Sequence, residues 1–143
     1  MSKVKVLGID NLYSKLSKIA YIDLKQPLTE ACLIVENEAK ERCPVDIGTL
    51  RSSITHEVED NQGFVGTNLE YAPYVEFGTG LFASKGDGRQ KPWTYQDAKG
   101  NWHTTVGQHP QPFLQPALDN NRDEVNKVIN NGISKELKKY VKR

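Results

Sequence analysis

The stretch YAPYVEFGTG, residues 71–80, separates two unlike parts of the chain. Segments with helical and strand periodicity precede it, and a run rich in Gly, Pro, Lys and aromatic residues follows it. We expect YAPY to form a short helical turn that packs on a sheet and buries Tyr71 or Tyr74 together with Val75. Gly78 and Gly80 would then give the backbone freedom where the following segment departs, because glycine adopts conformations closed to other residues.

Glu76 is the one charged residue of this stretch, and its surroundings look buried. A carboxylate in such a place needs a partner, and a bond to an arginine is a strong candidate. We expect Glu76 to pair with Arg51 in the segment GTLRSS and so to tie the helical turn to the body of the domain.

Two amphipathic helices are predicted upstream. Apolar residues at spacings of three and four indicate a helix around residues 10–20, with Asp10 or Asn11 near its start as a cap. A second helix over 27–42 would have Pro27 in its first turn, and Glu36 among the residues of its solvent face. Pro44 ends it, because the residue before a proline avoids helical geometry.

A β-hairpin is predicted between these helices and the opening stretch. SITHEVED alternates in polarity, NQG indicates a turn, and FVGTN reads as a second strand, so the strands would cover 53–60 and 63–68. A short helical turn is expected just before it, at Thr49–Ser53 after Gly48, in the segment that contains Leu50.

The segment 79–111 is predicted to form an extended arm. Trp93, Tyr95, Trp102 and Thr104 alternate on either side of an AKGN turn, which indicates a small hairpin. A loop of this length without a function would be unusual. A last helix is expected over 113–140, weakened at Asn131-Gly132.

These elements predict one α+β domain spanning residues 1–143. Its long helices would pack on one face of a small antiparallel sheet, built from 53–60 and 63–68 and joined by strands from 92–106 of the arm.

Composition excludes several classes of protein. The 143 residues carry a formal charge of +1, whereas a dedicated nucleic-acid binder is usually strongly basic. The N-terminus lacks the apolar core of a signal peptide and no run approaches a membrane span, so we expect a soluble intracellular product with no membrane partner. If Cys32 and Cys43 share a helix they lie about 16 Å apart, too far for a disulfide, so buried thiols are expected.

No catalytic or cofactor motif is found. GTG at 78–80 lacks the helix start and the Lys-Ser/Thr pair of a phosphate loop. His56, His103 and His109 are scattered, although the last two share a loop in which they could meet around a metal ion. Asp46 and Glu76 are the only carboxylates that could serve a hydrolase, and no nucleophile with an orienting base accompanies them. We therefore expect no enzyme, no cofactor and no metal.

A nucleic-acid-binding module is the alternative. It would use the 79–111 arm, where Lys85, Arg89 and Lys91 lie near Trp93 and Tyr95, a mixture that can hold phosphates and stack on bases. A basic C-terminal tail would assist it. That tail consists of Lys135, Lys138, Lys139, Lys142 and Arg143.

Three motifs in order resemble a known family. EAKERCPVDIGTLRSSI (38–54), GTNLEYAPYVEFGTG (66–80) and HPQPFLQPAL (109–118) together are similar to the HK97 gp10-like phage tail-component family. The only departure noted is Ile47, where Thr is frequent. The motif residues expected to hold the structure are Pro44, Asp46, Gly48, Leu50, Arg51, Tyr71, Tyr74, Glu76, Gly78, Gly80, Pro112 and Phe113.

The resemblance implies a structural virion protein with no catalysis and no cofactor. It would act as a homo-oligomeric ring in the neck or tail of a long-tailed bacteriophage and contact neighbouring neck or tail proteins, with DNA passing through its lumen. The choice between a neck protein and a tail terminator stays open. Aromatic residues of the arm are the expected interface with neighbours: Phe82, Trp93, Tyr95 and Trp102.

Overall fold

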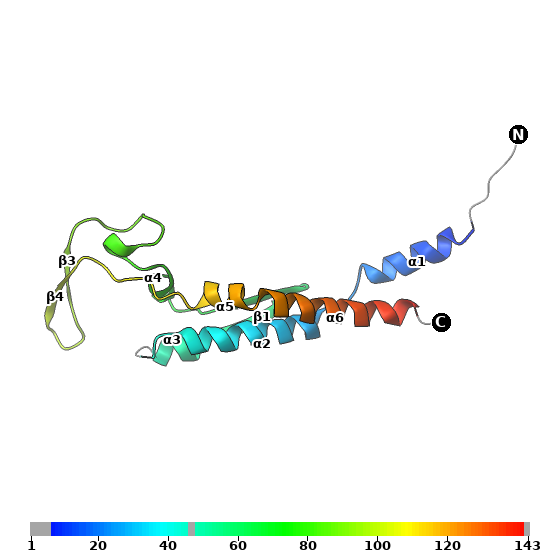
Figure 1. Ribbon diagram of the computed structural model, residues 1–143, viewed down its shortest axis with the longest axis horizontal. Helices are drawn as coiled ribbons and strands as arrows, with labels where there is room; N and C mark the ends of the chain where they lie inside the picture. Colours follow the sequence, from blue (N-terminus) through cyan, green and yellow to red (C-terminus); the bar gives the residue numbers. More distant parts are fainter. Residues whose placement is uncertain (1–6, 46–47, 142–143) are drawn as a thin grey trace, which may run out of the picture.

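The computed structural model describes residues 7–45 and 48–141 and has an elongated shape (Figure 1). Two long helices, α2 (Lys25–Arg42) and α6 (Arg122–Val141), lie side by side along its length. An arm leaves one end of this pair, and α1 (Ile9–Ile19) extends from the other. The predicted α+β class is confirmed. Within the described residues, no helix combines the length and apolar composition that crossing a membrane requires.

The core lies where α2 meets α5 (Leu114–Asn120), α3 (Gly48–Ser53) and α4 (Ala72–Phe77). Phe113, Leu50 and Ile54 are its largest fully buried side chains. Burying an apolar side chain of this size stabilises a fold by about 1.5–3 kcal/mol. Cys32 and Cys43 are also buried and unpaired, as expected, and burial raises the pKa of both thiols.

The first predicted hairpin forms, with a shorter turn than expected. Strand β1 (Thr55–Glu59) pairs antiparallel with β2 (Gln62–Gly66), so the two-residue turn is Asp60-Asn61 and not Asn-Gln-Gly. Both turn residues have positive φ, 50° and 58°, which suits a tight hairpin turn. The Asn61 side chain donates to the carbonyl of Ile22 and accepts from the Leu24 N–H, which fixes the turn beside the start of α2.

The arm contributes a sheet of its own, which corrects the single sheet predicted. Strands β3 (Trp93–Gln96) and β4 (Trp102–Thr105) pair only with each other, so the structure contains two separate two-stranded sheets. The arm hairpin lies well away from the first one (Figure 1). Because α4 and the turns after it direct the chain outward, β3 and β4 cannot reach the edges of β1 or β2.

The predicted last helix is interrupted at Asn121, between α5 and α6, and not at Asn131-Gly132. The glycine at position 132 stays helical because it faces Pro27 of α2. A Cβ on Gly132 would lie 2.4 Å from the Cβ of Pro27. The absence of a side chain therefore serves close helix packing at this position.

The first helix forms as predicted but contributes nothing to the core. Its apolar residues Ile9, Leu12 and Leu16 are 56%, 58% and 54% exposed, and the helix has no buried residue. The expected cap by Asp10 or Asn11 is wrong, because Gly8 occupies the N-cap position with a left-handed φ of 86° and no side-chain bond.

Candidate functional site

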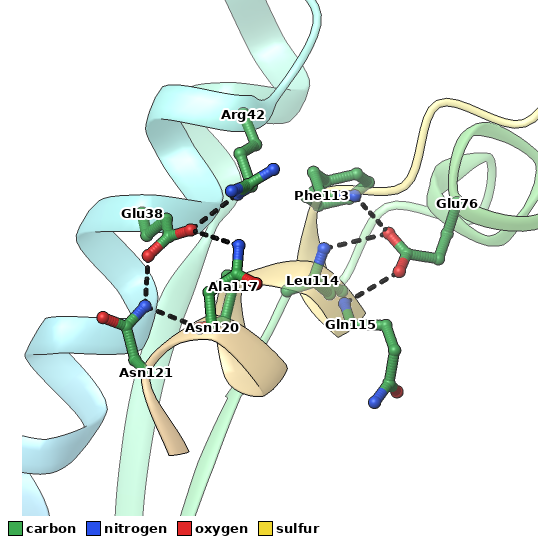
Figure 2. Close-up of polar contacts among 9 residues, drawn as sticks. All are labelled: Glu38, Arg42, Glu76, Phe113, Leu114, Gln115, Ala117, Asn120 and Asn121. Atoms are coloured by element: carbon green, nitrogen blue, oxygen red, sulfur yellow. Dashed lines mark hydrogen bonds and ion pairs between the residues drawn. The ribbon is translucent and has the colours of Figure 1, made fainter. Parts of the chain in front are cut away.

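The base of the arm is organised around the buried carboxylate of Glu76. Glu76 is 6% exposed and lies on α4, next to the start of α5. Its Oε2 accepts hydrogen bonds from the backbone N–H groups of Phe113 and Leu114, at 2.7 and 2.9 Å (Figure 2). Its Oε1 accepts from the N–H of Gln115 at 2.8 Å. One side chain thus satisfies three backbone donors located 37 to 39 residues away.

These bonds form because α5 lacks a cap of its own. The first amides of a helix have no partner within the helix, and Phe113 at the N-cap position offers no side-chain acceptor. A carboxylate suits the positive end of the helix dipole, and bonds to a charged acceptor are stronger than neutral ones. Glu76 therefore replaces the local Ser, Thr, Asp or Asn that usually begins a helix.

The predicted bond between Glu76 and Arg51 is wrong. Both oxygens of Glu76 are occupied by the α5 amides, and Arg51 lies on the exposed side of α3. The sequence held one usable signal: a helix beginning at Leu114 without a capping residue before it needs an acceptor from elsewhere.

The tyrosines of α4 are not its buried residues, which corrects a second expectation. Ala72, Val75 and Glu76, at spacings of three and four, form the face of α4 that points into the protein. Tyr71 and Tyr74 lie outside that face and are 37% and 59% exposed. Only the expected burial of Val75 is confirmed.

Glycines close the base of the arm, in agreement with the expected backbone freedom. Gly78 and Gly80 have φ of 74° and 60°, and a Cβ on Gly80 would lie 2.1 Å from the carbonyl oxygen of Val106. Between them, the Thr79 N–H donates to the carbonyl of Gln108 at 2.9 Å, and the Gln108 N–H donates to Thr79 Oγ1 at 2.9 Å. The outgoing and returning segments of the arm are therefore fastened together where they leave the body.

The turn of the arm hairpin is held by Asp97. Its carboxylate accepts from the backbone N–H groups of Lys99 and Asn101, both at 2.9 Å, and contacts His103 Nε2 at 2.8 Å. The bond with His103 and the bonds with Asn101 lower the pKa of Asp97 to about 2. His103 therefore stabilises the turn, whereas His109 stacks on Phe82, so the two histidines do not form a joint site.

The four aromatic residues predicted as an interface have different surroundings. Phe82 stacks on the ring of His109, with ring centroids 3.8 Å apart. The guanidinium carbon of Arg89 lies over Trp93, 5.6 Å from the centre of the tryptophan ring. Tyr95 and Trp102, on the arm hairpin, are 47% and 71% exposed. These exposed rings are free to contact another molecule, and their role as an interface stays a prediction.

Other motif residues are found in three different situations. Leu50 and Phe113 are fully buried in the core, whereas Gly48 and Pro112 are exposed. Pro44 follows the end of α2, as expected. The predicted role of Asp46, like the position of Ile47, falls outside the described residues.

Two carboxylates of α2 have roles that sequence reasoning missed. Glu38 accepts hydrogen bonds from Asn120 at 3.2 Å, from Asn121 and from Arg42 at 2.7 Å (Figure 2). These bonds, that from Arg42 first, lower the pKa of Glu38 and join α2 to the junction between α5 and α6. The adjacent asparagines Asn120 and Asn121, inside a helical pattern, were the sequence signal for the break between α5 and α6.

Glu36 is the second α2 carboxylate with an unexpected role. Its predicted place on the solvent face of the helix is wrong. It is 7% exposed, pairs with Lys40 at 2.5 Å and contacts His56 of β1. Burial opposes ionisation of Glu36, but the hydrogen bonds of Lys40 and His56 outweigh it and lower the pKa. The interaction fixes β1 against α2.

A metal site needs clustered His, Cys or carboxylate ligands. Within 7–45 and 48–141, no group of three or more His, Cys, Asp or Glu side chains is placed to hold a metal ion. Both carboxylate oxygens of Glu76 are engaged in capping α5. The arrangement is suited to holding an arm in a fixed position.

Comparison with known proteins gives one match. Residues 9–78, from the start of α1 to Gly78 just before the arm, match the family model described as "Bacteriophage HK97-gp10, putative tail-component". No curated protein and no solved structure matches the chain. The matched segment contains the first motif of the resemblance and all of the second except Thr79 and Gly80, and the third, HPQPFLQPAL, lies beyond it. Over residues 9–78 the chain is therefore similar to the HK97 gp10-like family of bacteriophage tail components.

Proposed function

We propose that this tail component joins head and tail, as a neck or tail-completion subunit that assembles into a homo-oligomeric ring. The match of residues 9–78 to a family of phage tail components supports a structural role in a phage particle. The observation that carries the finer proposal is the arm, 79–111, which projects clear of the helices from one end of an elongated body (Figure 1).

The arm has the properties of a contact element. Its base is closed by hydrogen bonds between Thr79 and Gln108, while Tyr95 and Trp102 stay exposed towards its far end. Tyr and Trp are favoured anchors in protein interfaces. A fixed base lowers the cost of ordering the arm on binding, and repetition around a ring multiplies weak contacts.

The remaining partners follow from the position of such a ring. Neighbouring neck or tail proteins would stack on it, and DNA would pass through its lumen without specific binding. Lys135 and Lys138 of α6 are exposed cations that could face this channel, whereas Lys139 pairs with Glu136 at 2.7 Å.

The first test is the mass of the purified chain, measured by light scattering over a range of concentrations and combined with negative-stain imaging. We expect a closed ring of one size. The double variant Tyr95→Ser/Trp102→Ser should shift the mass to smaller species. Tyr21→Ser is the matched control, because Tyr21 is 85% exposed but lies outside the arm.

Two results would contradict the proposal. One is a wild-type chain that stays monomeric at every concentration and has the same mass as the Tyr95→Ser/Trp102→Ser variant. The other is a monomer that binds DNA with a steep dependence on salt, which would instead indicate the nucleic-acid-binding module.

A further inference from the structure

A hollow beside the base of the arm combines an apolar wall with two cations. Its volume is about 430 Å³. We refer to it as the arm pocket, lined mainly by Pro73, Tyr74, Phe77, Lys85, Arg89 and Trp93. The ammonium of Lys85 lies 4.2 Å from the ring centre of Phe77, and the guanidinium of Arg89 lies over Trp93. Stacking on rings holds both cations at the pocket.

These cations lack acidic partners in the described part of the chain. None of the ion pairs found there includes Lys85 or Arg89. The arm as a whole, 79–111, has four Lys and Arg against two Asp, a net charge of +2. The pocket therefore suits an occupant that brings carboxylates together with an apolar side chain.

The same chain presents a surface of that chemistry on its first hairpin. Residues 55–66 contain Glu57, Glu59 and Asp60 and no Lys or Arg, a net charge of −3. Glu57 and Glu59 share one face of β1 because side chains alternate, and Phe64 lies opposite Glu57 on β2. Both glutamates are exposed, and Phe64 is 55% exposed. We refer to Glu57, Glu59 and Phe64 as the hairpin face.

One subunit cannot bring these two surfaces together. The turn of the hairpin is fixed beside Ile22 and Leu24 at the start of α2, and the arm leaves near the other end of that helix (Figure 1). The 18 residues of α2 span about 27 Å. Complementary surfaces at separate places on one chain produce head-to-tail contacts, which close into a ring when the rotation between subunits allows.

We propose that the hairpin face of one subunit docks into the arm pocket of the next. Phe64 packs on Tyr74 and Phe77, while Glu57 and Glu59 approach Lys85 and Arg89. This inference rests on the ring proposed above and names the surfaces that meet in it. Asp87 also lines the pocket. A second copy is favoured over DNA, because the hairpin face combines its carboxylates with the exposed ring of Phe64, which suits the apolar wall of the pocket.

Cross-linking tests the contact directly, even where association is weak. Chains carrying Glu57→Cys are mixed with chains carrying Lys85→Cys and treated with a short thiol-specific cross-linker. The native cysteines are buried and give little background. We expect heterodimers well above the yield of a control mixture of Glu124→Cys with Lys85→Cys, since Glu124 is exposed on α6 and is not part of the hairpin face. Equal yields would overturn the inference.

Charge reversal supplies the second test, with oligomer mass as the readout. Lys85→Glu/Arg89→Glu and Glu57→Lys/Glu59→Lys should each weaken self-association about tenfold to a hundredfold, because like charges then face one another. The chain that carries all four changes should recover it. All of these side chains are exposed, so unchanged circular dichroism is expected to show that each variant folds.

The outcomes separate this inference from the proposed ring. A wild-type ring whose mass and salt dependence survive both reversals would leave the ring standing and overturn the docking of the hairpin. Loss of DNA retention in Lys85→Glu/Arg89→Glu, with self-association unchanged, would overturn it in favour of a nucleic-acid surface.

Discussion

Replacement of Glu76 by alanine should lower the stability of the whole domain. The substitution removes the only acceptor that the structure provides for the N–H groups of Phe113, Leu114 and Gln115. It also leaves a small gap between α4 and α5. Because Phe113 belongs to the core, the disturbance is not confined to the arm.

The magnitude follows from the surroundings of each donor. The N–H of Phe113 is buried, and a buried donor without a partner costs about 1–3 kcal/mol. The other two amides are less buried and can bond to water, so their loss resembles removal of a helix cap, about 0.5–2 kcal/mol. The sum is about 1.5–5 kcal/mol, a large part of the 5–15 kcal/mol typical of a domain. The midpoint of thermal unfolding should fall by about 5–15 °C.

Urea unfolding followed by circular dichroism measures this change. Glu76→Gln keeps the size and one acceptor oxygen of the side chain, so its loss should be intermediate. Glu70→Ala is the matched control, because Glu70 is exposed and close in sequence. Stability of Glu76→Ala within about 0.5 kcal/mol of the control would refute the capping role, since surface substitutions usually fall in that range.

Three further results are expected. Gly80→Ala should expose the base of the arm to limited proteolysis, because a Cβ there clashes with the carbonyl of Val106. Gly86→Ala is the control, since Gly86 also has a positive φ but has open space around it, and equal cleavage of the two variants would contradict the close contact at Gly80. The pKa of Asp97 is lowered from 3.8 to about 2, so its contribution to the stability of the arm hairpin is complete above about pH 3.8 and is lost as the pH falls towards 2. NMR chemical shifts of the hairpin that already changed near neutral pH would contradict this. Leu12→Ser/Leu16→Ser should change the free energy of unfolding by less than about 1 kcal/mol, because α1 buries no residue, and a larger loss in a calorimeter would show hidden packing.

Local patterns in the sequence predicted the elements well. Alternation identified both hairpins, and spacings of three and four identified α1 and α2, because these periods follow from backbone geometry alone. The exact turn at Asp60-Asn61 was missed because two consecutive residues with positive φ are not obvious without glycine.

Long-range partners could not be predicted in the same way. An arginine is the usual partner of a buried carboxylate, but the amides of α5 carry no sequence signature and come within reach of Glu76 only after the chain folds. The same reason hid the contact between Glu36 and His56. Neither the separation of the two sheets nor the break at Asn121 follows from local periodicity, since both depend on where packing leaves space.

The closed base of the arm makes the arm a removable module. Its two ends are joined by hydrogen bonds between Thr79 and Gln108, so the fold of the body does not depend on the length of chain between these residues. Closing a longer or shorter loop changes the entropy only slowly with length. Related tail components could therefore gain, lose or exchange arms during evolution without redesigning the body, and a short linker in its place would give a compact variant for structural work.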